Sequence, residues 1–199
     1  MKRRVLLHAV AASSLGSCMA EQAAAYEWDE EVQLQGAEVV VVHLKHAYER
    51  VGRTAVWRDT TLTLNDGQRT VTQLFKGFHP IFLDRDNGTW YAVLSGSYYR
   101  KSQQEPGQDW GDLEGPYGQW AVRLGDDGWK PMSMTRLPAR FQEPNMLLLY
   151  GEEQEIARFH GKRVTLADKR AWLVRHPPGY SHLKLTRPIV PSQRPDRLN

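Results

Sequence analysis

The chain is poor in cysteine, and Cys18 is the only one among its 199 residues. A single thiol excludes an internal disulfide, so a folded domain must draw its stability from a buried core. The chain also lacks a long hydrophobic run, because the apolar stretch from Val5 to Leu15 is about half the ~20 residues that a bilayer-spanning helix needs. We therefore expect neither a disulfide scaffold nor a helix that spans a membrane.

Net charge is also missing from most of the chain. The formal charge of +3 comes from Lys2, Arg3 and Arg4, since residues 1–17 hold no acidic residue and the other 23 basic residues balance 23 acidic ones. Proteins that bind nucleic acid normally carry a net basic surface, so nucleic acid is not an expected partner. The balance is uneven, however, with a formal charge of −8 over residues 18–157 and +8 over residues 158–199. Either the two parts neutralise each other when packed, or a basic C-terminal surface faces anionic lipid headgroups, lipopolysaccharide or an acidic partner.

The sequence contains no motif that identifies a particular reaction. It contains no nucleophile elbow, zinc-protease helix, phosphate-binding loop or dinucleotide fingerprint. His43 and His46 are three residues apart in a predicted strand, so they point to opposite faces and do not share a metal. The carboxylates of Glu30-Glu31 diverge in the same way, and Asp126-Asp127-Gly128 is typical of a turn. We expect no metal and no cofactor, and the sequence favours a noncatalytic protein over an enzyme.

The N-terminus has the layout of a secretory signal, with three basic residues, a short apolar run and small residues before Cys18. The tetrad Leu15-Gly16-Ser17-Cys18 resembles the lipobox of bacterial lipoproteins. This resemblance implies that residues 1–17 are a signal peptide and that Cys18 is the lipid attachment site. Because Met19 follows the cysteine, it also implies anchoring in the outer membrane, facing the periplasm. The alternative is an ordinary signal cleaved after Ala25, which would give a secreted periplasmic protein.

The rest of the chain divides into a tether, one domain and a tail. We expect a tether over residues 18–27, a single β-rich globular domain over residues 28–187, and a disordered tail over residues 188–199, where prolines occur without apolar periodicity. The domain opens with Trp28-Asp29-Glu30-Glu31-Val32-x-Leu34, which is similar to the opening of uncharacterised proteobacterial lipoproteins. That similarity implies no activity.

Alternating apolar residues and turn dipeptides predict an antiparallel β-meander. Three turns rich in Asp, Asn and Gly lie between apolar runs, at Asn65-Asp66-Gly67, Asp86-Asn87-Gly88 and Asp126-Asp127-Gly128. The predicted strands cover Trp28–Leu34, Ala37–Tyr48, Val56–Leu64, Arg69–Phe75, Pro80–Asp84, Thr89–Tyr98, Gln119–Leu124 and Trp129–Met134.

Two C-terminal segments read as helical. Helix-forming residues dominate Met146–Gly161, and Leu166–His176 carries an apolar stripe through Leu166, Trp172 and Leu173. Thr165 and Asp168 form a shortened capping box before the second helix. The predicted fold class is therefore α+β, mainly an antiparallel β-meander with one or two C-terminal helices.

The segment of residues 102–119 is long for a loop, and long loops without secondary structure are often functional. Its aromatic rings could stack on sugars while its carboxylates accept hydrogen bonds from hydroxyl groups. The interpretation that we favour is a satellite core in which these aromatics cap the sheet edge. The possible ligand-binding residues are Asp109, Trp110, Asp112, Glu114, Tyr117 and Trp120.

Two functions remain open. The first is a lipid-anchored periplasmic envelope protein that acts as a noncatalytic binding or assembly subunit, with the membrane and another envelope protein as partners. The alternative is a protein that binds or hydrolyses cell-wall glycan through residues 102–119. The first needs only the anchor and the β domain, whereas the second needs a catalytic arrangement that the sequence does not supply.

Overall fold

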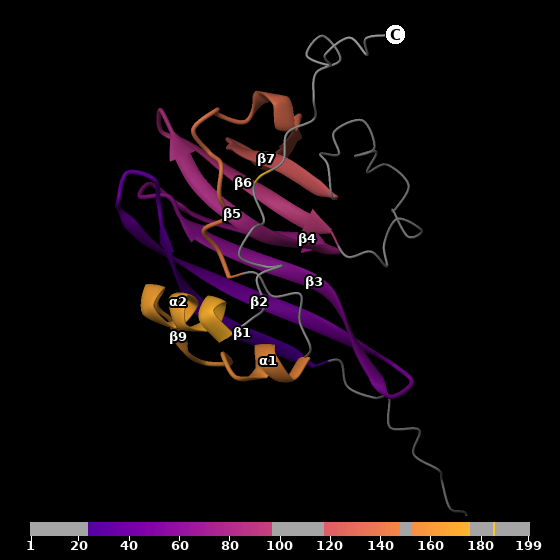
Figure 1. The fold of residues 1–199 in the computed structure, drawn as a ribbon. Helices are drawn as coiled ribbons and strands as arrows, with labels where there is room; N and C mark the ends of the chain where they lie inside the picture. Colours follow the sequence, from indigo (N-terminus) through magenta and orange to yellow (C-terminus); the bar gives the residue numbers. More distant parts are fainter. Residues whose placement is uncertain (1–23, 97–117, 148–152, 176–184, 186–199) are drawn as a thin grey trace, which may run out of the picture.

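The computed structural model describes residues 24–96, 118–147, 153–175 and 185, and this part folds into two β-sheets with two short helices (Figure 1). The first sheet has the strand order β4-β3-β2-β1-β9, and the second has the order β5-β6-β7-β8. The strands are β1 (Ala25–Gln33), β2 (Val39–Val51), β3 (Thr54–Asn65), β4 (Thr70–Lys76), β5 (Phe78–Asp86), β6 (Thr89–Gly96), β7 (Gln119–Gly125), β8 (Gly128–Met132) and β9 (Arg163–Val164).

The α+β, mainly antiparallel fold that the sequence predicts is confirmed. Strands β1 to β8 overlap the eight predicted strands, with ends that differ by up to three residues, and successive strands within each sheet pair antiparallel. The turn residues act as their chemistry predicts: Asn65 Oδ1 accepts from the Gly67 amide, and Asn87 adopts a φ of 49°. Short polar turns thus set the register of each hairpin.

The chain crosses from the first sheet to the second at Gly77. This residue separates β4 from β5 with a φ of 74°, in the left-handed region that favours glycine. The Arg69 guanidinium forms a second link, since it donates to the carbonyls of Gly125 and Asp126 at 2.6 and 2.5 Å. The β3–β4 turn is therefore held against the β7–β8 turn.

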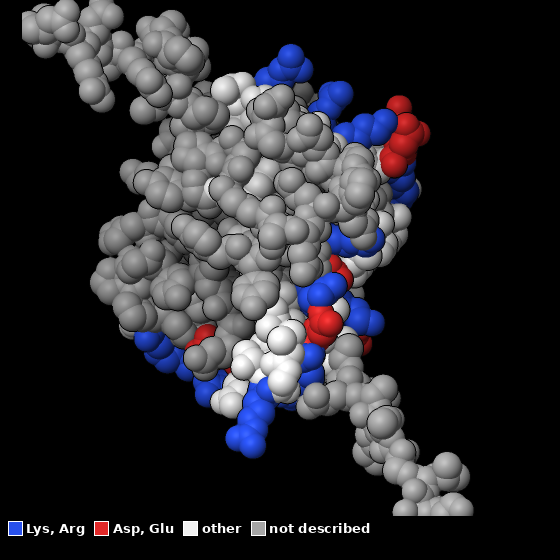
Figure 2. Space-filling model, turned by 90° about the vertical axis from the view of Figure 1, so that its right-hand side faces the viewer, with Lys and Arg blue, Asp and Glu red and all other residues white. Residues whose placement is uncertain are grey.

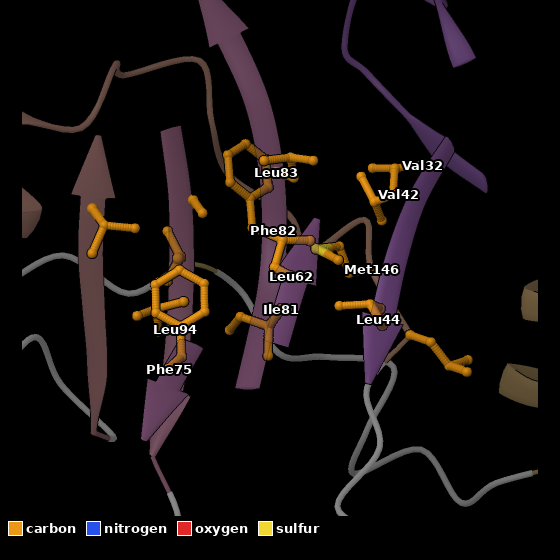
Figure 3. Packing of buried hydrophobic residues seen from close by; sticks show 14 of the residues in the cluster. Val32, Val42, Leu44, Leu62, Phe75, Ile81, Phe82, Leu83, Leu94 and Met146 are labelled. Atoms are coloured by element: carbon orange, nitrogen blue, oxygen red, sulfur yellow. The ribbon is translucent and has the colours of Figure 1, made fainter. Parts of the chain in front are cut away.

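The hydrophobic core lies between the two sheets. Val32, Val42 and Leu44 from the first sheet and Ile81 and Leu83 from the second are at most 1% exposed and lie in one cluster (Figure 3). Strand β5 is buried on both faces, and the ring of Phe82 packs 5.0 Å from that of Phe141. Phe141 therefore covers part of the second sheet on the side away from the first, whereas Met146 lies between the two sheets (Figure 3).

The helices differ in part from the prediction. Helix α1 (Glu153–Ala157) has only five residues, and Met146 is not helical, because its amide donates to the Ile81 carbonyl at 3.2 Å beside β5. Residues 148–152 of the predicted first helix lie outside the described residues. The prediction of one continuous helix over residues 146–161 is therefore wrong.

Helix α2 (Leu166–Arg175) is confirmed, and so is its capping box, in which the Asp168 amide donates to Thr165 Oγ1 and the Thr165 amide donates to Asp168 Oδ2. The predicted apolar stripe is confirmed at Trp172 and wrong at Leu173. Lys169 and Trp172 are the buried residues of this helix, whereas Leu173 is 39% exposed. A buried carboxylate on β1 holds Lys169 inward, as described below.

The first strand starts earlier than the predicted tether allows. Strand β1 begins at Ala25, and the Ala24 carbonyl accepts from the Tyr48 amide at 2.8 Å. Residues 25–27 thus belong to the sheet, because β2 is long enough to pair with them. At the other end, Leu185 is 5% exposed and bonds to the Gln142 carbonyl, while the predicted tail lies outside the described residues. Among the described helices, none is long and apolar enough to cross a membrane.

Candidate functional site

The structure describes only one of the predicted ligand-binding residues, Trp120. Its side chain is 6% exposed and meets Phe78 edge-on at 4.8 Å. A Cβ atom added at Gly96 would lie 2.8 Å from the Trp120 ring, so this glycine makes room for it. Trp120 is therefore a core residue, in agreement with the satellite-core interpretation rather than with a sugar-stacking role. Cys18, Asp109, Trp110, Asp112, Glu114 and Tyr117 lie outside the described residues.

A pair of buried histidines joins the two sheets. His46 on β2 and His79 on β5 are 1% and 4% exposed, and His46 Nε2 lies 2.9 Å from His79 Nδ1. His43 lies on the opposite face of β2, where its Nδ1 is 3.0 Å from Asp29 Oδ1. The sequence thus predicted correctly that His43 and His46 diverge, but it did not predict the partner of His46.

Hydrogen-bond chemistry fixes the tautomers of the pair. The Leu147 carbonyl lies 2.8 Å from His79 Nε2 and can only accept, so this nitrogen of His79 carries a hydrogen. In the neutral ring, His79 Nδ1 then accepts from His46 Nε2, which leaves His46 Nδ1 as an acceptor. The pair is therefore a directed chain of donors that ends on a backbone carbonyl.

Burial keeps both rings neutral. It lowers the pKa of His46 well below its ordinary value of 6.5, and the neighbouring His79 lowers it further. Burial lowers the pKa of His79 to about 4, although its bond to the Leu147 carbonyl acts in the opposite direction. Trp28 and Trp57 lie 4.8 and 5.7 Å from the His46 ring, so aromatic groups surround it.

A buried ion pair lies beside the histidines. Glu30 on β1 is fully buried, and its Oε1 accepts from Lys169 Nζ at 3.1 Å and from the Leu147 amide at 2.6 Å. The other oxygen accepts from Trp28 Nε1 at 3.3 Å, and Lys169 also donates to the Asn145 carbonyl at 2.5 Å. The peptide groups around Leu147 therefore connect the ion pair to the histidine pair. We call the side chains of Glu30, His46, His79 and Lys169, together with these peptide groups, the buried polar network.

Two buried polar atoms, one in the buried polar network and one beside it, have no hydrogen-bond partner among the described residues. They are His46 Nδ1 and Thr60 Oγ1, on residues that face each other across β2 and β3. Both residues are at most 1% exposed, so neither atom is accessible to a substrate. No group of three or more metal-ligating side chains occurs in the described part of the chain. The arrangement suits a structural joint between sheets, α2 and residues 145–147 better than a catalytic site.

The alternation of residues along β1 and β2 could have predicted that Glu30 and His46 are buried. Glu30 lies between Trp28 and Val32 on the same face of β1, and His46 follows Val42 and Leu44 on the same face of β2. Both polar residues are therefore placed on the buried side by the period-two pattern alone. No sequence signal pairs His46 with His79, or Glu30 with Lys169.

The outer face of the first sheet is open to solvent. Its side chains are all exposed or half-buried, and Val39, Val41 and Leu74 are 45%, 38% and 46% exposed. Thr63 and Thr72 share a hydrogen bond of 3.0 Å across β3 and β4. Both described helices lie elsewhere, since α1 binds Tyr26 and Arg50 and α2 binds Glu30. On β2, β3 and β4 this face presents mainly valine, leucine and threonine side chains, whereas β1 adds the carboxylates of Glu27, Asp29 and Glu31.

The uneven charge of the sequence is partly resolved by packing. Acidic strand β1 lies beside basic β9, with Asp29 opposite Arg163, and Glu30 pairs with Lys169. Figure 2 shows basic and acidic side chains interspersed over the described surface of one face, with basic side chains along its lower edge. Among the described residues, one ion pair, Glu30 with Lys169, therefore links the acidic and basic parts of the chain.

Comparison with protein-family models, curated proteins and solved structures gave no match. The residues described above, together with the N-terminal motif, therefore carry the functional inference for this chain.

Proposed function

We propose that this chain is a lipid-anchored envelope protein, attached through Cys18 and facing the periplasm, whose β domain binds or assembles with another envelope protein without catalysing a reaction. The observation that carries the proposal is the position at which the sheet begins. Strand β1 starts seven residues after Cys18 and already uses Ala24 and Ala25 in its pairing with β2.

The start of β1 favours cleavage before Cys18 over cleavage after Ala25. Cleavage after Ala25 would remove the Ala24 carbonyl that accepts from the Tyr48 amide, and it would also remove the Ala25–Ala47 pair. It would place a charged amino terminus at Tyr26, whose ring packs 5.8 Å from that of Tyr48. Cleavage before Cys18 leaves the strand intact and keeps residues 18–23 as a tether.

The inaccessible polar groups favour a noncatalytic role. General acid–base chemistry needs a titratable group within hydrogen-bond reach of a substrate. Glu30, His46 and His79, which form the densest titratable cluster among the described residues, are at most 4% exposed and are engaged with one another and with backbone groups. These groups are suited to holding the fold.

The outer face of the first sheet is the surface that we assign to the protein partner. It is broad, it is not covered by α1 or α2, and it combines exposed valine and leucine with threonine hydroxyls. Interfaces between proteins often combine such apolar and hydrogen-bonding groups. The glycan alternative is left with residues 102–117, because Trp120 is buried.

Site-specific photocrosslinking in intact cells tests this function. A photoreactive residue at Thr61, in the middle of the outer face, should capture one discrete envelope protein. The matched control is the same residue at Arg123, which is exposed on β7 in the second sheet. Equal capture from both positions, or capture of glycan at Thr61, would contradict the proposed function.

A further inference from the structure

The basic residues of β9, α2 and the turn before β9 differ from most others in the described part of the chain. Arg158, Lys162, Arg163, Arg170 and Arg175 are all exposed, and none forms an ion pair among the described residues. Elsewhere in the described chain, six exposed or half-exposed cations are each paired with a carboxylate: Arg50, Arg58, Arg69, Arg85, Lys130 and Arg140. The exposed cations without a described ion pair there, such as Arg123 and Arg136, do not lie together on one helix.

The acidic residues near these cations accept hydrogen bonds or lie beside other side chains, and they keep their negative charge. Asp168 caps the start of α2 through Thr165, and Glu30 is buried against Lys169. Glu27 and Asp29 flank His43 on β1. Residues 158–175 hold six basic residues and one acidic residue, so this segment carries a net positive charge beside the carboxylates of β1.

Exposed aliphatic residues accompany this charge. Val174 is 87% exposed and Leu173 is 39% exposed, and Arg170 and Arg175 lie on the same helix. Trp172 and Lys169 hold the opposite side of α2 against the domain, with 5% and 9% exposure. Basic residues flanking exposed aliphatic side chains are typical of a helix that rests on an anionic bilayer surface.

The position of α2 is compatible with a lipid anchor at Cys18. The α2 start bonds to Glu31, near the end of β1, whereas the tether enters at the beginning of the same strand. The tether of six residues spans at most about 20 Å, and β1 is roughly 30 Å long. When β1 lies along the bilayer surface, the tether at its beginning and α2 near its end can therefore both reach the same bilayer.

We infer that β9 and α2 form a docking surface for anionic phospholipid headgroups, with Leu173 and Val174 entering the interface and Lys162, Arg163, Arg170 and Arg175 contacting phosphates. This inference rests on the proposed membrane location and adds the orientation of the domain. The β1 edge faces the bilayer, and the outer face of the first sheet remains accessible to a partner.

Vesicle co-sedimentation tests the inference with the full chain carrying Cys18→Ser, so that no acyl chain contributes. Binding is compared between vesicles of phosphatidylcholine alone and vesicles that also contain phosphatidylglycerol. We expect a preference for the anionic vesicles that declines with added salt. Because each surface cation contributes appreciably at such a membrane, Arg170→Glu with Arg175→Glu should reduce this preference about tenfold or more.

The matched control reverses two charges elsewhere, by Arg123→Glu with Arg136→Glu, since both residues are exposed and neither forms an ion pair among the described residues. The control should keep the preference for anionic vesicles. Residues 1–17 are the same in every variant, so their basic residues cannot cause a difference between variants. Equal losses in both double variants, or no preference for anionic vesicles in the parent chain, would overturn the inference. A parent chain that prefers anionic vesicles but carries no lipid when Cys18 is restored would instead contradict only the anchor.

Discussion

The imidazole of His79 donates to the carbonyl of Leu147 at 2.8 Å, although the two residues are 68 positions apart. The amide of the same Leu147 donates to the buried Glu30 carboxylate. One residue between β8 and α1 thus connects a histidine on the second sheet to a carboxylate on the first.

The stability of the domain should fall as the pH falls from about 6.5 towards 4. The pKa of His79 is lowered from 6.5 to about 4 in the folded state, and that of His46 is also lowered, so the unfolded chain binds protons first. Their stabilising contribution is present above pH 6.5 and is lost on acidification. At about 1.4 kcal/mol per pKa unit, His79 alone accounts for roughly 3 kcal/mol by pH 4.

Chemical denaturation across this pH range provides the measurement. His79→Gln should flatten the dependence of the unfolding free energy on pH. The control Thr63→Ala, which removes a hydroxyl on the outer face that does not titrate, should leave the wild-type slope unchanged. If His79→Gln and the wild type show the same slope, the histidine pair does not titrate as the structure indicates.

Lys169→Met should destabilise the domain by about 3–5 kcal/mol, because it leaves the Glu30 carboxylate buried without its cation. Adding Glu30→Gln to this variant should recover part of the loss. The control is Lys130→Met, which breaks an exposed ion pair with Asp127 and should cost less than about 1 kcal/mol. Equal effects of the two lysine substitutions would argue against a buried ion pair.

Trp120→Ala should cost about 3–5 kcal/mol, because its ring fills the space between Phe78 and Gly96. Val174→Ala, at a residue that is 87% exposed, should change the unfolding free energy by less than about 0.5 kcal/mol. Thermal melts of both variants check the comparison. A Trp120→Ala variant as stable as the wild type would return this residue to the set of candidate ligand-binding groups.

Local patterns were sufficient to predict the strands and most turns. The alternation in Val42, Leu44 and His46 and the Asn65-Asp66-Gly67 turn are local signals, and each specifies a hairpin without reference to the rest of the chain. The same alternation places Glu30 and His46 on the buried side. Their presence in the core was therefore accessible from the sequence, although it was not predicted.

Contacts between elements that are distant in the sequence could not be predicted from local patterns. The pairing of His46 with His79 depends on how the chain turns at Gly77 between the sheets, and the non-helical path at Leu147 depends on Glu30 and His79 binding its peptide groups. Lys169 is buried because it forms an ion pair with the Glu30 carboxylate on β1. A helical periodicity analysis assigns such a lysine to the solvent side, so the predicted stripe on α2 included Trp172 correctly but placed Leu173 on the buried side in place of Lys169.

The central claim is that Cys18 carries the lipid that anchors this domain. Intact-mass and peptide mass spectrometry of the protein purified from its native envelope tests it most directly. We predict a mature chain that begins at residue 18, with acyl chains on this cysteine, and Cys18→Ala should abolish both the adduct and membrane retention. A mature chain that begins at Tyr26 without any acyl group would contradict the claim.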